Sequence, residues 1–159
     1  MAIKKKGVLT QGTKVWVLHG EVPTLTRMDC ITSIEFGDDS ATDIDDTCLE
    51  ETETKTSQPG LNTPGEGSIK IKTDPDNASH MTLLKLAEEK AAVKIYVGWS
   101  DGTTAPTLAT NTVTLPTTRT FSSFDAILRA NSPTFEPDSL VEHSIGLKRQ
   151  SKVTTIFRT

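Results

Sequence analysis

An acidic segment in the first half of the chain offers the most obvious chemistry. It reads I-E-F-G-D-D-S-A-T-D-I-D-D-T-C-L-E-E-T-E-T-K-T-S-Q-P-G from residue 34 to residue 60. Nine of the chain's 21 acidic residues, and no Lys or Arg, lie between Glu35 and Glu53. Carboxylate oxygens are the ligands that Ca²⁺ prefers in proteins. The first hypothesis is therefore a calcium-binding loop.

The spacing of these acids does not fit a standard calcium loop. An EF-hand loop needs acids at positions 1, 3 and 5, Gly at position 6 and Glu at position 12. Counted from Asp43, position 6 is Cys48 and position 12 is Thr54, and a count from Asp38 or Asp39 fits no better. A looser site on Asp43, Asp45 and Asp46 stays open as an alternative. A solvated or interfacial acidic loop fits the spacing better.

Other catalytic and metal-binding patterns are missing from the sequence. The histidines His19, His80 and His143 are far apart, and neither cysteine has a partner at zinc-ligand spacing. The sequence contains no G-x-S-x-G nucleophile motif. Its G-E-G element precedes a predicted strand, whereas phosphate binding uses the N-terminus of a helix. We therefore expect no enzyme activity, no cofactor and no bound metal.

The composition indicates a single β-rich domain with material outside its core. A chain of 159 residues is long enough for one core and short for two. The hydrophobic fraction is 35%, below the usual ~45–50%, a range that also counts Gly. Thr occurs 26 times and favours strands because it is branched at Cβ.

Charge and hydropathy exclude two classes of partner. The net charge of −4 argues against a general nucleic-acid binder, which needs a basic surface to displace counterions from phosphates. No stretch approaches the ~18 consecutive apolar residues of a membrane span. We therefore expect no membrane association. Two isolated cysteines without a secretory signal fit a reducing compartment.

Hydrophobic alternation predicts the elements that must position any functional side chains. Strands are predicted at residues 13–19, 25–36, 68–73, 92–100, 121–130, 140–148 and 152–157. One helix is predicted at about 77–90, where D-P-D-N supplies a cap and a proline tolerated in the first turn. We expect a mainly β sandwich or open barrel of about seven or eight strands with one flanking helix.

Three segments fall outside this core. A short N-terminal arm at residues 1–12 precedes the single domain at 13–159. Two long excursions are expected within the domain, at about 37–67 and 103–120. Thr at positions 52, 54 and 56 has strand periodicity, which predicts a polar strand over 47–57. We expect this strand to form a projecting hairpin with residues 68–73, with a charged loop before it and a turn at P-G.

Ordering such segments has a thermodynamic cost that a monomer does not recover. Each fixed residue costs ~1–2 kcal/mol of backbone entropy. A polar strand becomes favourable when its backbone pairs with another subunit's sheet, because ladder hydrogen bonds then replace core burial. The sequence therefore indicates an assembly protein, and head-to-tail contacts between copies would generate rings or filaments.

The order of these parts resembles the tail tube proteins of long noncontractile-tailed bacteriophages, the siphovirus type. The resemblance covers nearly the whole chain. It rests on T-K-V-W-V-L-H, the acidic segment, P-G-L-N-T-P-G-E-G, S-I-K-I-K, the D-P-D-N-A-S-H-M-T-L-L-K-L-A-E-E helix, K-I-Y-V-G-W and F-E-P-D-S-L-V-E-H-S-I-G-L-K-R. The Thr-rich residues 103–120 have no clear place in it.

The resemblance implies a specific assembly. Such proteins have a β-sandwich-like core with one flanking helix, and their strands close into a β-barrel around the channel of a hexameric ring. Rings stack along a tape measure protein, terminator and tip proteins cap the tube, and the genome passes through the lumen without specific binding. It further implies a virion component that is assembled in the host bacterial cytoplasm and uses no cofactor.

Within this assembly, the acidic segment is expected to form a contact between subunits or between rings. The candidate acidic residues are Asp38, Asp39, Asp43, Asp45, Asp46, Glu50, Glu51 and Glu53. The candidate basic partners on a neighbouring copy are Lys4, Lys5, Lys6, Lys148, Arg149 and Lys152. Charge reversal at Asp45 and Asp46 is expected to impair stacking. Two alternative functions stay open: a calcium-dependent β-sandwich adhesion or binding module, and a related type VI secretion-like tube ring protein.

Overall fold

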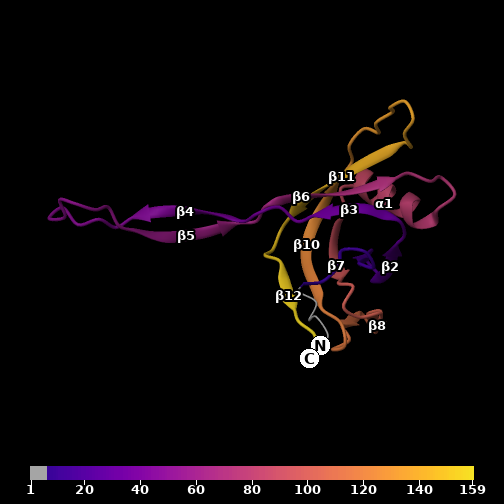
Figure 1. Ribbon diagram of the computed structural model, residues 1–159, viewed down its shortest axis with the longest axis horizontal. Coiled ribbons are helices and arrows are strands. Elements are labelled where there is room, and N and C mark those ends of the chain that lie inside the picture. The colour runs from indigo at the N-terminus through magenta and orange to yellow at the C-terminus, as the bar shows by residue number, and fades with distance from the viewer. Residues whose placement is uncertain (1–6) are drawn as a thin grey trace, which may run out of the picture.

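In the computed structural model, which describes residues 7–159, eight strands form one curled sheet and a two-stranded ribbon projects from it (Figure 1). The sheet has the order β2-β1-β7-β10-β11-β6-β3, and β12 also pairs with β10. The strands of this sheet are β1 Lys14–His19, β2 Thr24–Met28, β3 Ile31–Glu35, β6 Glu66–Lys72, β7 Ala92–Gly98, β10 Phe121–Arg129, β11 Glu142–Arg149 and β12 Thr154–Ile156. The predicted mainly β class is confirmed.

The two ends of the main path are neighbours in sequence, which forces the sheet to curl. Strands β2 and β3 lie at opposite ends of the order, yet only Asp29 and Cys30 separate them. Cys30 takes a positive φ of 51° in this turn, so residues 25–36 form two strands, not the single extended segment predicted. The sheet therefore closes toward an open barrel.

The one helix of residues 7–159, α1 Ala78–Glu88, packs against the barrel and is fastened to the β2–β3 turn. Its N-cap residue Asn77 accepts a hydrogen bond from the Ser79 amide at 3.0 Å. The Ser79 hydroxyl accepts a bond from the Asp29 amide, and the Nε2 atom of buried His80 lies 2.7 Å from the Asp29 carbonyl oxygen. The helix predicted at about 77–90 is confirmed.

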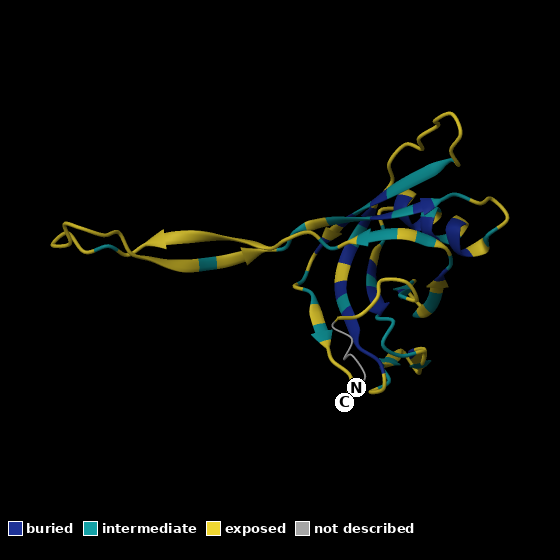
Figure 2. Ribbon diagram, in the orientation of Figure 1, coloured by how far each residue is buried: buried dark blue, intermediate teal, exposed yellow. Residues whose placement is uncertain are grey.

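Alternating residues of the curled sheet and one face of α1 form the main core. Figure 2 shows this core as the dark segments of the body. Burying each large aliphatic or aromatic side chain contributes roughly 1.5–3 kcal/mol. The buried sheet residues include Val15, Val17, Ile69, Ile71, Val93, Ile95, Val97, Phe124, Leu128, Ile145 and Leu147, and the helix adds Leu83, Leu86 and Ala87.

The Thr-rich residues 103–120 cover a second, smaller cluster on the outer face of the sheet. They form a short hairpin of β8 Thr107–Ala109 and β9 Thr112–Thr114. Its two turn residues both have positive φ, as a tight hairpin turn requires. Val113 and Leu115 pack against buried Trp16, Tyr96 and Phe121. This segment, predicted as a surface excursion, is therefore partly a cover over aromatic side chains.

A buried arginine holds that cover in place. Arg119 is 1% exposed, and its guanidinium lies 5.3 Å from the Trp16 ring centroid. It donates hydrogen bonds to the carbonyl oxygens of Trp99 at 2.6 Å and Gly98 at 3.0 Å. It also reaches the Thr104 carbonyl in the Thr-rich segment. One side chain therefore joins the sheet to its cover.

Replacing this arginine tests its role in the fold. Arg119→Met keeps an apolar stem but leaves several carbonyl oxygens without donors, so the free energy of unfolding should fall by about 3 kcal/mol. Chemical denaturation measures the change. The control Lys152→Met alters an exposed side chain and should shift stability by no more than about 0.5 kcal/mol. Equal stability of the two variants would contradict this role for Arg119.

Candidate functional site

The most unusual feature of the molecule is the projecting ribbon, here called the arm and defined as residues 38–65. It consists of β4 Ser40–Asp45 and β5 Ser57–Thr63, joined by the tip at residues 46–56. Figure 2 shows that nearly every residue of the arm is exposed. A strand of six residues spans about 20 Å, so the tip stands well away from the body.

The strands of the arm lie elsewhere than the sequence predicted. Residues 47–57 were predicted as a strand but form most of the tip, and the predicted charged loop at 38–46 contains β4. The threonine periodicity was misleading because the Glu51 carboxylate binds the Glu53 and Thr54 amides, at 3.0 and 3.4 Å, in a local turn.

The predicted turn at Pro59 and Gly60 lies inside β5. Proline is tolerated there because a two-stranded ribbon has free edges, so its missing N–H breaks no further ladder. The ribbon is irregular at this point, and a side chain at Gly60 would approach the Thr42 carbonyl oxygen at 2.6 Å. The projecting hairpin is thus present, but β5 and not residues 68–73 is the partner strand.

The arm has no core on either face. Its apolar side chains Ile44, Leu49 and Leu61 are 57%, 104% and 92% exposed. An isolated two-stranded ribbon is marginally stable in water, because ladder hydrogen bonds alone only replace bonds to solvent. A stable position of the arm therefore requires fastening at its root or contact with another molecule at its surface.

A buried arginine supplies the fastening at the root. Arg149 is 3% exposed and donates to the carbonyl oxygens of Phe36 at 2.7 Å and Gly37 at 3.0 Å. It also forms a hydrogen-bonded ion pair with Asp39, whose carboxylate accepts the Gly65 amide at 3.2 Å. Arg149, Asp39 and Gly65 therefore link the body to both strands of the arm, and we call this group the root latch.

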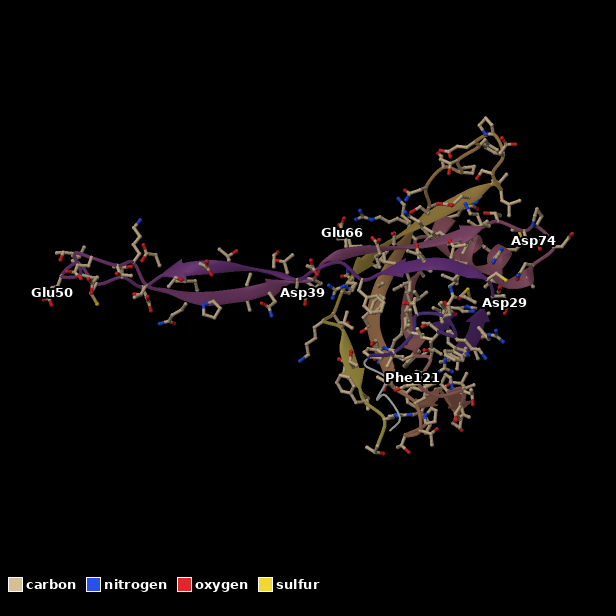
Figure 3. All side chains as sticks on the ribbon, in the orientation of Figure 1. Asp29, Asp39, Glu50, Glu66, Asp74 and Phe121 are labelled. Carbon is tan, nitrogen blue, oxygen red and sulfur yellow. The ribbon has the colours of Figure 1, made fainter. Side chains whose placement is uncertain are left out.

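Glycine allows the chain segments at the root to cross closely. Gly37 has a φ of +74°, and a side chain there would overlap the Glu66 carbonyl oxygen. A side chain at Gly67 would overlap the carbonyl oxygen of Glu35 on the neighbouring strand. Figure 3 shows Asp39 and Glu66 together at the root and Glu50 at the far end of the arm.

The predicted acidic residues divide into two groups. The carboxylates of four residues form hydrogen bonds or ion pairs with groups of their own chain. Asp39 contacts Arg149 and Gly65; Asp45 accepts the Thr47 amide at 2.9 Å; Asp46 accepts Gln58 Nε2 at 2.8 Å; and Glu51 caps the tip turn. Among residues 7–159, the carboxylates of the other four make no hydrogen bond or ion pair. These are Asp38, Asp43, Glu50 and Glu53.

The hydrogen bonds of the first group favour the charged carboxylates. Bonds from Arg149 and then from the Gly65 amide hold the pKa of Asp39 below its ordinary value. Bonds from Thr47 lower the pKa of Asp45, and bonds from Thr56 and Gln58 lower that of Asp46. Charge reversal at Asp45 and Asp46 would therefore disturb the arm itself as well as any contact it makes.

The predicted basic residues also differ in how exposed they are. Arg149 is buried and paired with Asp39 of its own chain, so it presents no free charge to a neighbouring copy. Lys148 is exposed on the outer face of β11, and Lys152 is exposed in the β11–β12 connection. Lys4, Lys5 and Lys6 lie outside the described residues. No local sequence pattern predicts the Arg149–Asp39 pair, whose members are far apart in the chain.

Residues 7–159 contain neither a metal-ligand cluster nor a membrane-spanning helix. In this part of the chain, no three His, Cys, Asp or Glu side chains come together as a group able to hold a metal ion. The helix found there has neither the length nor the apolar character needed to cross a membrane.

Sequence similarity to known proteins covers nearly the whole chain. The family model described as "Phage tail tube, TTP, lambda-like" matches residues 6–159. Structural protein 3 of Pseudomonas phage PAJU2 is 32% identical over 150 residues, which cover 91% of this chain and 91% of that protein.

Solved structures with low sequence identity share the fold. The SPP1 tail tube has a TM-score of 0.66 at 10% identity, over 96% of this chain and 80% of that chain. The sheath/tube terminator of the extracellular contractile injection system PVC has a TM-score of 0.63 at 11% identity, over 96% and 98%. The anti-feeding prophage baseplate has a TM-score of 0.62 at 6% identity, over 97% and 98%.

The root latch makes a prediction about pH. Because the folded-state pKa of Asp39 lies below its ordinary value of 3.8, the latch is complete above that pH and is lost as pH falls through the lowered pKa. Protection of the Gly65 amide against hydrogen exchange, measured by NMR as a protection factor, should therefore drop in strong acid. Asp39→Asn should lose about tenfold of that protection at neutral pH and show no acid transition. An unchanged acid transition in this variant would contradict the assignment to Asp39.

Proposed function

Because the chain belongs to the lambda-like family of phage tail tube proteins, it is a structural component of the phage tail, and we propose that its copies form hexameric rings that stack into the tube. The observation that carries this proposal is the exposed arm, which has no core on either face. A contact with another copy gives that arm the burial that its own chain does not supply.

Ring formation in this proposal uses the free edges of the sheet. In the half-sheet β2-β1-β7-β10-β12, strands β2 and β12 have neighbours on one side only. Pairing β12 of one copy with β2 of the next would remove both edges and continue the sheet around the ring. The exposed side chains Ile156 and Phe157, 55% and 66% exposed, would be covered at the same contact.

Stacking in this proposal uses the arm. The four acids without partners in the described part of the chain, Asp38, Asp43, Glu50 and Glu53, stand on a fastened support and are available to another subunit. Asp39, Asp45, Asp46 and Glu51 contribute indirectly, since they hold the arm in its shape. Exposed Lys148 and Lys152 remain candidate partners, together with Lys4, Lys5 and Lys6 at the N-terminus.

The finished tube would conduct the phage genome. A net charge of −4 suits such a conduit, because an acidic wall repels phosphates and does not retain passing DNA. The proposed partners are a tape measure protein within the tube and terminator and tip proteins at its ends, with assembly in the host bacterial cytoplasm. The proposal includes neither enzyme activity nor a cofactor.

The ring contact can be tested at the β12 edge. Ile156→Lys places a charge at the proposed subunit boundary and should reduce ring and tube formation at least about tenfold, while the stability of the monomer changes by no more than about 0.5 kcal/mol. Negative-stain microscopy and sedimentation measure assembly. The control Met81→Lys, on a 37% exposed residue of α1, should assemble normally. Normal rings from the Ile156 variant would refute this edge contact.

The stacking contact can be tested at the tip without disturbing the arm's own hydrogen bonds. Glu50→Lys combined with Glu53→Lys should leave single rings intact but reduce tube length strongly, because like charges would then meet at the contact. Lengths measured by microscopy give the result. The matched control Glu136→Lys combined with Asp138→Lys makes the same charge change in an exposed loop of the body. Tubes of full length from the tip variant would rule out a role for these acids.

A further inference from the structure

We infer that the tip of the arm docks in a basic groove on the body of a second copy of the chain. The inference rests on the proposed stacking of this protein and names the surface that receives the arm. The groove is lined by Lys90, Ile127, Arg129, Ala130 and Lys148, among others, and has a volume of about 610 Å³.

Three elements meet at this groove and fix its chemistry. Lys90 follows the C-terminal end of α1, Ile127 and Arg129 come from β10, and Lys148 comes from β11. Ile127 and Lys148 are direct partners in the antiparallel register, so their side chains lie on the same face of the sheet. The three cations are exposed, and Ile127 is half-buried between them. The groove thus combines a basic rim with an apolar floor.

The tip has the complementary charge. Residues 46–56 contain four carboxylates and one lysine, a net charge of −3. The groove carries Lys90, Arg129 and Lys148 against Glu88, a net charge of +2. The single ion pair of Arg129 among the described residues is with Glu66 at 3.9 Å, with both side chains at least half exposed. Such a pair is weak enough to be exchanged for a carboxylate of another chain.

The tip also has an apolar side chain for the floor of the groove. Leu49 is 104% exposed and lies next to Glu50, whose carboxylate makes no hydrogen bond or ion pair in the described part of the chain. Seating Leu49 against Ile127 and Ala130 would remove it from water while its acidic neighbours face the basic rim. An apolar anchor surrounded by complementary charge is the usual arrangement of a specific contact.

The position of the groove identifies the occupant as a second copy. A smaller adjoining groove, lined by Glu66, Gly67, Arg129 and Lys148, extends to the root of the chain's own arm. Figure 3 shows the tip residue Glu50 far from Glu66 at that root, so an arm does not reach its own groove. Each copy would present a tip and receive one at its root. This head-to-tail contact repeats without limit, as stacking requires.

A charge exchange between the two surfaces tests the inference. Arg129→Glu combined with Lys148→Glu should shorten tubes as strongly as the tip variant Glu50→Lys with Glu53→Lys, by at least about tenfold in length. Combining all four substitutions should restore much of the length, because the complementary charges are exchanged. Lys85→Glu, which reverses an exposed charge of α1 outside the groove, should have little effect.

The native tip thiol gives a second test. In a Cys30→Ser background, Ala130→Cys places an acceptor thiol in the groove opposite exposed Cys48 of the tip. Mild oxidation of assembled tubes should yield a ladder of disulfide-linked chains, because each copy carries one thiol at its tip and one in its groove. Ser139→Cys, in the exposed β10–β11 loop, is the control and should give no ladder.

The outcomes separate this inference from the proposed function. Shortened tubes from the tip variant, with normal tubes from the groove variant and no ladder from the Ala130 variant, would overturn the groove as receptor and leave arm-mediated stacking intact. Normal tubes from both charge variants would overturn the stacking role of the tip. Restoration by the combined variant together with the ladder would establish the groove as the receptor.

Discussion

A two-stranded ribbon without a core depends on what holds its ends, and much of this molecule follows from that constraint. Strands β4 and β5 gain mainly ladder hydrogen bonds, which exchange protein–water bonds for protein–protein bonds at little net benefit. The root is therefore fixed by Arg149, which is buried where the barrel meets the arm. The tip remains without burial in the single chain, and this deficit is what a neighbouring copy would satisfy.

Two buried arginines solve the same physical problem at different places. Arg119 and Arg149 each donate to several backbone carbonyl oxygens where a long connection crosses the body. A guanidinium suits this position because its planar group of donors satisfies carbonyls from separate segments at once. Arg119 orders the cover over the aromatic cluster, and Arg149 directs the arm. Acidic side chains near the tip complete the local support by capping amides.

The sequence predicted the parts of the fold in which local pattern and burial agree. Alternation identified strands such as β6 and β7, and the D-P-D-N cap identified the helix, because core burial imposes those periodicities directly. The arm register could not be predicted this way, since neither of its faces is buried. Its threonine periodicity therefore carried no information about strand pairing. The conformation of the tip depends instead on the turn that the Glu51 carboxylate caps.

Long-range polar contacts were the other part that pattern did not reveal. Nothing near Arg149 distinguishes it from exposed Lys148, and their different roles depend on which side of β11 each occupies. Similarly, Val113 and Leu115 in the Thr-rich segment pack on the cluster around Trp16, and Arg119 ties that segment to the sheet by its bond to the Thr104 carbonyl oxygen. The family resemblance predicted the assembly role, whereas the division of the acids into supporting and available groups needed the structure.

Hydrogen exchange of the arm tests most directly whether its stability comes from another copy. The measurement compares the backbone amides of β4 and β5 in the free chain and in assembled tubes. The account predicts rapid exchange in the free chain beyond the root latch, and strong protection along the arm and tip after assembly. Equal protection in both states would contradict it, because the arm would then be stable without a partner.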